Sequence, residues 1–446
     1  MKNISYTLLA LTFMNMAIIF FPGTESWNRP LFNYDYSLAL ISIIFLGRWG
    51  IALLGCLFLI DIIVTQSRTY YFISVIDFIQ SLKDFNQLNI LSYLDARNSI
   101  LILIACVCIV VALKLRNIIS NKLPSAVAIL CLCIILFILD IFNGTAYVVR
   151  LDSNIISRNI AGSTSYSFLK NAFTREDKRK ITSSPPGRRI NNRFDIINWA
   201  KNNHTRGIVI VVVESFGMPN SKIVQEWLHS NIKNNNFDLM TSQLEFKGST
   251  TNGELRILCE LEGSYMALNS KNSISCLPKK LSNMGWSTSA YHGFSRNMFN
   301  RKDWWPAIGF QKIYFYENFH ANKIPKCGDV FRGVCDDELI KIGLDSHSGE
   351  KLTYILTLNT HLPVIEEPIP LDLKKICVDE NISNVVCMHL SLLGNRLSSI
   401  VMQGGDIKKL PLIIIAGDHA PPFSEIRNRN IFSQNLVPLY ILKPVK

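Results

Sequence analysis

Four long apolar stretches in the first 145 residues constrain the fold more than any other feature of the sequence. Each approaches or exceeds the roughly 20 residues that a membrane-crossing helix needs. A cleaved signal peptide accounts for one such stretch near the N-terminus, but not for four in series. The sequence therefore predicts a membrane anchor over residues 1–145. The stretches are residues 4–21, 36–64, 99–113 and 125–142, the second being interrupted by Arg48 and Asp61.

Loop charges favour five crossings over four. Lys2 opens the chain, and the connection after the third stretch carries Lys114, Arg116 and Lys122 without an acidic residue. The positive-inside rule places both segments on the cytoplasmic side, which requires an even number of crossings between them. Residues 70–82, or a split of the second stretch, must supply the extra crossing. Residues 70–82 also fit an amphipathic helix in the membrane interface. Five crossings leave the C-terminal part outside the cytoplasm.

Six cysteines in the C-terminal part indicate an oxidising compartment. An even number suggests three disulfides, and sequence order suggests the local pairs Cys259–Cys276, Cys327–Cys335 and Cys377–Cys387. The alternative is six buried thiols in a cytosolic domain. A structural zinc site is less favoured because the sequence has no CxxC pair. The other five cysteines lie in the apolar stretches, where they act as small hydrophobic residues.

The net charge is +12, and much of the excess lies between Arg175 and Arg193. We interpret residues 146–204 as a basic juxtamembrane linker, which either rests on anionic lipid headgroups or is simply solvated. Nucleic acid is disfavoured as a partner of a membrane-tethered external domain.

From residue 205 onward, short apolar strands alternate with helical stretches. This pattern predicts an α/β domain over residues 205–446, with a mostly parallel sheet covered by helices on both faces. The expected strands are residues 208–213, 287–291, 353–358, 412–416 and 436–442, and the expected helices are residues 222–233, 278–284 and 383–403.

Four of these strands end in residues that bind metals or phosphate. Glu214, His292 and His361 each follow a strand, and Asp418 with His419 follows the fourth. Ligands of open α/β sheets bind beyond the carboxyl ends of the strands. Each residue alone fits an ordinary surface or core position, but four such ends at one edge predict a single crevice with a divalent cation.

The nucleophile is expected in the segment Gly248 to Glu254. Thr251 and Glu254 have the spacing of a capping box for a following helix, which leaves Thr250 unengaged at the helix N-terminus. Unpaired N–H groups there favour a phosphate. A threonine hydroxyl attacks only when a metal or base removes its proton. The alternative is that these hydroxyls are only caps and turn formers.

His292 and Arg301 are placed to reach an anionic group, since arginine binds phosphate oxygens in a bidentate way. Trp304 and Trp305 follow directly. They either form an apolar wall for a substrate, lie at the lipid interface, or pack in the core.

Taken in order, these motifs resemble the alkaline phosphatase/sulfatase superfamily. They are Glu214-Ser215-Phe216-Gly217, Gly248-Ser249-Thr250, His292 with Arg301, Asn359-Thr360-His361 and Gly417-Asp418-His419. More narrowly, the motifs resemble those of the membrane-anchored phosphotransferases of this superfamily. These are the lipoteichoic acid synthases, the lipid A phosphoethanolamine transferases and the phosphoglycerol transferases. It covers roughly residue 206 to the C-terminus.

This resemblance implies a site and a reaction. Glu214, Thr250, Asp418 and His419 would bind one Zn²⁺ or Mn²⁺ ion, and His292, Arg301 and His361 would hold the substrate. Thr250, with Thr251 as the second choice, would attack the phosphate of a phospholipid donor and carry it covalently to a cell-surface glycan or lipopolysaccharide. The protein would be a multi-pass protein of the bacterial inner membrane with its catalytic domain in the periplasm.

Departures from the family pattern narrow the choice of reaction. The nucleophile turn lacks the C/S-x-P-x-R context of sulfatases, which disfavours sulfate ester hydrolysis. Ala420-Pro421-Pro422 follows the Asp-His pair where the phosphoethanolamine branch usually has Gly-Glu, and no histidine follows His419. We therefore prefer phosphoglycerol to phosphoethanolamine, although the cysteine pairs resemble the latter branch. The alternatives are a phosphodiesterase-type hydrolase and a non-catalytic external domain.

Overall fold

The computed structural model describes the chain in two compact units. Described residues up to Phe173 form the N-terminal unit, and those from Ile181 onward form the C-terminal unit. The described residues are 2–19, 30, 32–69, 96–119, 122–142, 161–173, 181–319, 324–346, 349–364, 366–401, 410–423 and 425–445.

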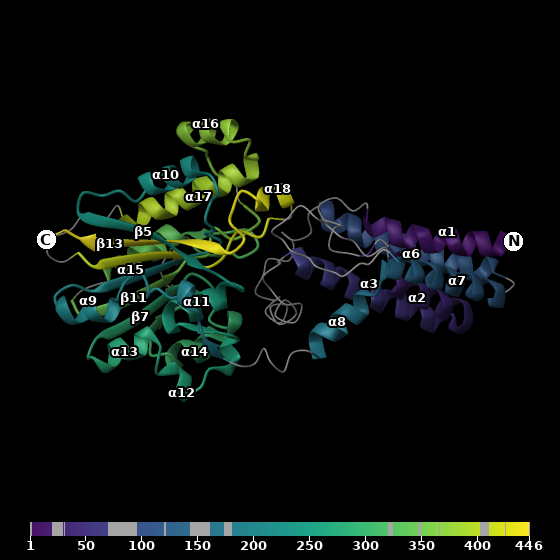
Figure 1. The fold of residues 1–446 in the computed structure, drawn as a ribbon, viewed down its shortest axis with the longest axis horizontal. Coiled ribbons are helices and arrows are strands. Elements are labelled where there is room, and N and C mark those ends of the chain that lie inside the picture. The colour runs from purple at the N-terminus through teal and green to yellow at the C-terminus, as the bar shows by residue number, and fades with distance from the viewer. Residues whose placement is uncertain are drawn as a thin grey trace. The chain divides into compact units, whose positions relative to one another are not determined.

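The N-terminal unit is helical, and its long helices coincide with the four apolar stretches (Figure 1). The second stretch is divided at Gly47, where α2 ends and α3 begins. The helices are α1 (Lys2–Ile19), α2 (Tyr34–Leu46), α3 (Arg48–Thr69), α6 (Ala96–Ile118), α7 (Lys122–Phe142) and α8 (Thr164–Phe173), and β1 (Phe32–Asn33) pairs with β2 (Ala161–Gly162).

One helix among the described residues is both long and apolar enough to cross a membrane. It is the Lys122–Ile141 part of α7, and only 17% of its most apolar window is buried, unlike the core helix of a soluble protein. Residues 70–82 lie outside the described residues. The number of crossings therefore stays a prediction.

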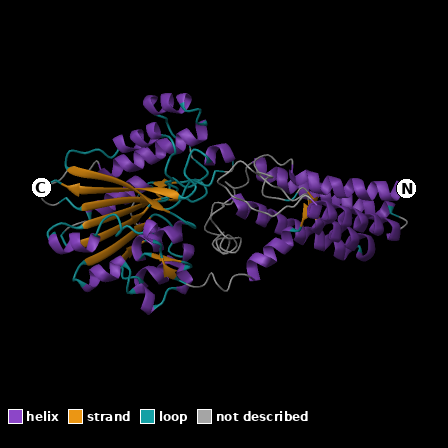
Figure 2. Cartoon of the chain, in the orientation of Figure 1, coloured by secondary structure: helices purple, strands orange, loops and turns teal. Residues whose placement is uncertain are grey.

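The C-terminal unit is built on a seven-stranded sheet in the order β5-β13-β12-β4-β11-β7-β8 (Figure 2). The run β12-β4-β11-β7-β8 is parallel, and β13 is antiparallel to both of its neighbours. The predicted α/β fold with a mostly parallel sheet is confirmed. The strands are β4 (Ile208–Val213), β5 (Phe237–Glu245), β7 (Ser287–His292), β8 (Lys312–Tyr314), β11 (Lys351–Leu356), β12 (Leu412–Gly417) and β13 (Leu436–Pro444).

Helices cover both faces of this sheet, as Figure 1 shows. Alternation along β11 separates the faces: Tyr354 stacks edge-on against Trp305 of α14, whereas the neighbouring Ile355 lies under Gly343 of α15. On the α15 face are α10 (Lys222–Ser230), α15 (Asp336–Asp345), α16 (Leu371–Asp379) and α17 (Asn384–Val401); α11 (Thr250–Cys259), α13 (Leu277–Asn283) and α14 (Arg301–Ala307) lie on the other side.

Smaller elements connect this framework. They are β3 (Thr182–Ser183) paired with β6 (Leu261–Glu262), β9 (Lys326–Cys327) paired with β10 (Gly333–Val334), the helices α9 (Ile196–Asn202), α12 (Ser270–Ser273) and α18 (Ile426–Arg429), and short 3₁₀ turns.

The core of the C-terminal unit begins before residue 205. All six residues of β4 are buried, and Ile190, Ile196 and Ala200 belong to the same core. The last part of the range interpreted as a linker therefore packs with the α/β domain. The three predicted local disulfides are confirmed: Cys259–Cys276, Cys327–Cys335 and Cys377–Cys387.

Candidate metal centre and nucleophile

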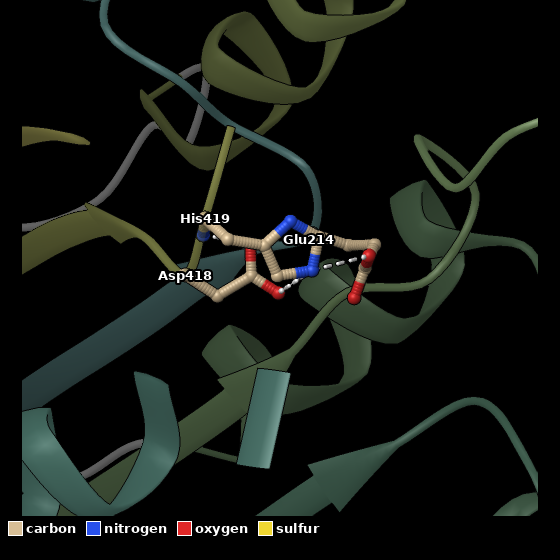
Figure 3. Close-up of side chains that lie close together, drawn as sticks. All are labelled: Glu214, Asp418 and His419. Atoms are coloured by element: carbon tan, nitrogen blue, oxygen red, sulfur yellow. Dashed lines mark hydrogen bonds and ion pairs between the residues drawn. The ribbon is translucent and has the colours of Figure 1, made fainter. Parts of the chain in front are cut away.

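Two adjacent strand ends bring three potential metal ligands together. Strands β4 and β12 pair in parallel with Val213 opposite Gly417, so Glu214 and the Asp418-His419 pair leave the sheet side by side. One ligand atom from each of the three residues lies within 4.8 Å of the other two. His419 Nε2 is 3.4 Å from Glu214 Oε1 and 3.4 Å from Asp418 Oδ2 (Figure 3). All three side chains are buried.

Hydrogen bonds fix the strand end that carries Glu214. Its amide donates to Thr357 Oγ1 at 3.0 Å, and its carbonyl accepts from the Thr360 hydroxyl at 2.5 Å. Both threonines belong to the segment after β11, the neighbouring strand of β4. The motif Asn359-Thr360-His361 therefore helps to position Glu214, through Thr360.

The residues present fit a divalent cation. Asp418 Oδ2 is buried and has no hydrogen-bond partner, although it lies beside the other two potential ligands. A buried carboxylate oxygen without a partner is costly unless it is neutralised by a proton or a metal. Two carboxylates and an imidazole are a donor set that both Zn²⁺ and Mn²⁺ accept.

Without a cation, protons neutralise this cluster. Burial, together with the Glu214 carboxylate, raises the pKa of Asp418 to about 8. Burial alone would lower the pKa of His419, but the Asp418 and Glu214 carboxylates raise it to about 9. Burial would raise the pKa of Glu214, yet its hydrogen bond and charge interaction with His419 hold that pKa below its usual range. Glu214 is therefore the ionised carboxylate of the set.

Thr250 joins these three residues from the first turn of α11. Its hydroxyl donates to Glu214 Oε2 at 3.0 Å and lies 3.4 Å from His419 Nε2. It is the first residue of the helix, where the unpaired N–H groups and the helix dipole stabilise negative charge. The four residues expected to form the metal and nucleophile site thus lie together.

The helix start differs from the predicted capping box. Ser249, and not Thr251, occupies the N-cap position, and no side chain caps the helix. Glu254 is fully buried and accepts hydrogen bonds from Arg301, Trp305 and Tyr354. The capping prediction is wrong because a buried ion pair on the core side of α11 takes the Glu254 carboxylate away from the helix start.

Close packing places α11 against the strand end of β12. A Cβ atom on Gly253 would lie 2.9 Å from Asp418 Cβ, so only glycine allows this approach. One turn later, Arg256 Nη2 donates to the Asp418 carbonyl at 2.9 Å. These contacts fix the distance between Thr250 and the carboxylates.

Two of the expected substrate-binding residues flank the centre. Nδ1 of His292 pairs with the Leu356 carbonyl at 3.1 Å, and burial and Arg301 lower the His292 pKa to about 3. Nδ1 of His361 pairs with the Leu362 carbonyl at 2.6 Å, and burial lowers its pKa. The Glu214 charge acts on both rings. Both rings are therefore neutral and lie within reach of the Glu214 charge.

Arg301 occupies a different position from the one expected of a phosphate ligand. It is 2% exposed, and its Nε and Nη2 donate to Glu254 Oε2 at 3.1 and 2.9 Å. Trp305 Nε1 donates to the other oxygen of Glu254 at 3.0 Å, and Trp304 Nε1 donates to the Phe299 carbonyl. Of the three alternatives for the tryptophans, core packing describes both.

Sequence reasoning missed Ser215, His389 and Asp336. The Ser215 amide and hydroxyl bind Asp418 and Glu214, and His389 Nε2 donates to the Ser215 carbonyl. The Asp336 carboxylate accepts the amides of Leu358 and Asn359, just before His361. Two of them have a signal in the sequence, since Ser215 belongs to the motif Glu214-Ser215-Phe216-Gly217 and Asp336 directly follows the disulfide residue Cys335. His389 lies inside a helix with no local signal.

Comparisons with known proteins give likenesses in structure only. No protein-family model and no curated protein matches the sequence. The chain is similar to the lipoteichoic acid synthase LtaP from Listeria monocytogenes at 17% identity and a TM-score of 0.39, over 61% of this chain and 71% of that one. It is similar to a protein in the alkaline phosphatase superfamily from Vibrio parahaemolyticus at 16% identity and a TM-score of 0.38, over 54% of this chain and 61% of that one.

A third likeness is to the Streptococcus pyogenes phosphoglycerol transferase GacH in complex with sn-glycerol-1-phosphate. Identity is 14% and the TM-score 0.34, over 58% of this chain and 76% of that one. Likenesses at these TM-scores carry no argument about fold or function, which rest on the strand order and the distances given above.

Proposed function

We propose that the chain is a metal-dependent phosphotransferase. It moves a phospholipid headgroup phosphate, through a covalent intermediate on Thr250, onto a cell-surface glycan or lipopolysaccharide. The single observation that carries the proposal is the placement of the Thr250 hydroxyl, 3.0 Å from Glu214 Oε2 and 3.4 Å from His419 Nε2, at a helix N-terminus. A hydroxyl that serves only as a cap would bond to the helix amides instead.

Glu214, Asp418, His419 and Thr250 would hold the cation, either Zn²⁺ or Mn²⁺. When bound, a divalent cation lowers the pKa of a coordinated hydroxyl and polarises a phosphoryl oxygen. The ionised Glu214 accepts the hydrogen bond of the Thr250 hydroxyl and so orients its oxygen. The first amides of α11 face the same space and stabilise negative charge there.

Two displacements complete the reaction. First, Thr250 Oγ1 loses its proton and forms a bond to the donor phosphorus, while the bond from phosphorus to the diacylglycerol oxygen breaks. That oxygen takes up one proton, so one proton passes overall from Thr250 to the diacylglycerol. Second, the hydroxyl oxygen of the acceptor bonds to the same phosphorus and loses its proton, and Thr250 leaves as the hydroxyl. His292 and His361 each hold their one proton on Nδ1 against a backbone carbonyl, so the neutral rings offer Nε2 as an acceptor for a hydroxyl of the headgroup.

Arg301 is the expected substrate ligand that the geometry supports least, because Glu254 engages its guanidinium. We assign it to the support of α11, with phosphate binding as its secondary role. Phosphoglycerol remains our first choice for the transferred group and phosphoethanolamine our second, on the residues that follow His419.

We place the protein in the inner membrane of a bacterium, as a multi-pass protein whose α/β domain lies in the periplasm. The three disulfides and the lipid-compatible surface of α7 support this location.

The function is tested with the full chain in detergent, supplied with phosphatidylglycerol or phosphatidylethanolamine and with extracted surface glycan. Mass spectrometry should show the glycan heavier by the headgroup phosphate, together with free diacylglycerol. Release of the headgroup phosphate without glycan modification would indicate a hydrolase. A protein that binds no metal and yields no diacylglycerol would be a non-catalytic domain.

A further inference from the structure

Ser215 connects the two carboxylates of the candidate metal centre. Its amide donates to Asp418 Oδ1 at 2.8 Å, and its hydroxyl donates to Glu214 Oε1 at 3.0 Å. Each carboxylate thereby has one oxygen held by Ser215. Glu214 Oε2 is left for Thr250, and Asp418 Oδ2 is left without a hydrogen bond.

The conformation of Ser215 is one that a serine rarely adopts. Its φ of 55° lies in the left-handed region, which is unfavourable for a residue with a Cβ atom. Such a residue persists only where its surroundings over-determine it. Glycine would relieve the strain but would lack the hydroxyl that holds Glu214.

His389 binds the third polar group of Ser215, its backbone carbonyl. Its Nε2 lies 3.1 Å from the Ser215 carbonyl, which can only accept, so Nε2 carries the proton. The ring is 0% exposed and packs edge-on against Phe423 and Phe432. Burial lowers its pKa to about 4, so the ring stays neutral and Nδ1 is left without a hydrogen-bond partner.

Burying His389 with Nδ1 unpaired costs free energy, whatever the other nitrogen does. Leucine would fill a position of this kind in α17 without an orphaned nitrogen. The His389 bond instead holds the carbonyl of the Ser215–Phe216 peptide, while Asp418 holds the amide of the Glu214–Ser215 peptide. Both peptide planes around the strained residue are thereby restrained, and with them the direction of its hydroxyl.

We propose that Ser215 and His389 are positioning residues of the metal centre. Together they set the separation of the Glu214 and Asp418 carboxylates, and through it the affinity for the cation. This inference rests on the proposed function in so far as it takes these carboxylates to be metal ligands.

The test measures Mn²⁺ binding, and then Zn²⁺ binding, by titration calorimetry on the full chain in detergent after chelator treatment. The His389→Leu change should weaken binding about 10- to 100-fold, the usual effect of losing a residue that orients a ligand. His389→Gln should restore affinity close to that of the unchanged protein, because its amide nitrogen reaches about as far as Nε2. His389→Asn places its nitrogen where Nδ1 lies and should not.

Two further variants separate positioning from packing. His229→Leu is the matched control and should leave affinity unchanged, since the His229 ring of α10 packs against Tyr440 of β13. Ser215→Gly should keep or raise the unfolding temperature because it relieves the strained φ, yet lower metal affinity about 10- to 100-fold. If His389→Leu does not fold, Ser215→Gly alone decides the question.

Full affinity in His389→Leu or Ser215→Gly would overturn the inference. Equal weakening by glutamine and leucine at position 389 would overturn it too, since the ring would then act by packing. If the unchanged protein binds neither metal, the proposed function fails first and the inference with it. These outcomes are distinguishable in one set of titrations.

Discussion

At the scale of the residue, the proposed reaction depends on Thr250, whose Oγ1 is the proposed nucleophile. The structure places its hydroxyl against both Glu214 and His419. Thr251 points elsewhere, with its Oγ1 3.4 Å from the Ser249 hydroxyl. The one-residue difference along a helix turns the side chain by about 100°, which is enough to separate the two roles.

Thr250→Ala should therefore abolish transfer while leaving the fold intact. We expect turnover to fall by roughly 10⁴-fold or more, as happens when a nucleophile that acts together with other catalytic residues is removed. Stability should change by only about 1 kcal/mol, the usual value of one hydrogen bond. Diacylglycerol release and thermal unfolding measure the two effects. If Thr251→Ala loses activity and Thr250→Ala keeps it, the nucleophile is the neighbouring residue.

Proton competition at Asp418 and His419 gives the metal affinity a pH dependence of defined sign. In the metal-free protein the pKa of Asp418 is raised to about 8 and that of His419 to about 9. A metal binds the deprotonated ligands. Below the pKa of a ligand, its proton must leave before the metal binds, so the apparent affinity rises about tenfold per pH unit for each such proton. Mn²⁺ titrations from about pH 6 to about pH 9, a range that spans the first pKa and ends at the second, should show affinity rising with pH. A flat profile would exclude these groups as the ligands.

At the scale of the element, α11 is held by an ion pair on its core side. Glu254 lies one turn after Thr250 and pairs with Arg301 at 2.9 Å, with both side chains almost fully buried. Burial raises the pKa of Glu254, while the charge of Arg301 and hydrogen bonds from Arg301, Trp305 and Tyr354 oppose that rise. The pair links the nucleophile helix to α14.

Arg301→Met should lower the free energy of unfolding by about 3–5 kcal/mol, because it leaves a buried carboxylate without its partner. The double change Glu254→Gln with Arg301→Met should recover most of that loss, since glutamine keeps an acceptor for Trp305 and Tyr354 without a charge. Urea unfolding measures both. A double variant no more stable than Arg301→Met would show that packing of the guanidinium, and not charge, dominates.

The elements that the sequence predicted well are those whose local pattern suffices. Strands β4, β11 and β12 are short, mostly apolar runs that are followed by a polar residue. Strand β7 is mainly small and aromatic residues and ends in His292. The parallel register puts these polar residues at one edge. By contrast, β5 was missed because its solvent-exposed positions dilute the apolar pattern, and β8 because it has three residues.

What the sequence could not give depends on contacts between distant residues. The Glu254 carboxylate is drawn into the core by Arg301, 47 residues later, so a local capping signal failed. His389 reaches Ser215 across 174 residues, and no spacing rule connects a mid-helix histidine to a strand end. Local sequence patterns predict what a short segment prefers by itself, and contacts with distant residues override that preference.

At the scale of the whole molecule, two units of different chemistry share one chain. The helical unit exposes many large apolar side chains, among them Leu123, Ile134 and Phe137 of α7. The α/β unit buries most of its apolar residues in one large core and carries the three disulfides. This division agrees with the proposed membrane anchor joined to an external domain, since in that proposal lipid would replace water only around the first unit.

The proposed orientation is tested by thiol labelling in intact spheroplasts with a membrane-impermeant maleimide. Lys374→Cys, exposed on α16, should label without lysis, because five crossings place the α/β unit outside the cytoplasm. Lys114→Cys, exposed near the end of α6, is the matched control and should label only after permeabilisation, since the positive-inside rule places it in the cytoplasm. Labelling of position 374 only after lysis would put the disulfides in a reducing compartment and exclude a periplasmic transferase.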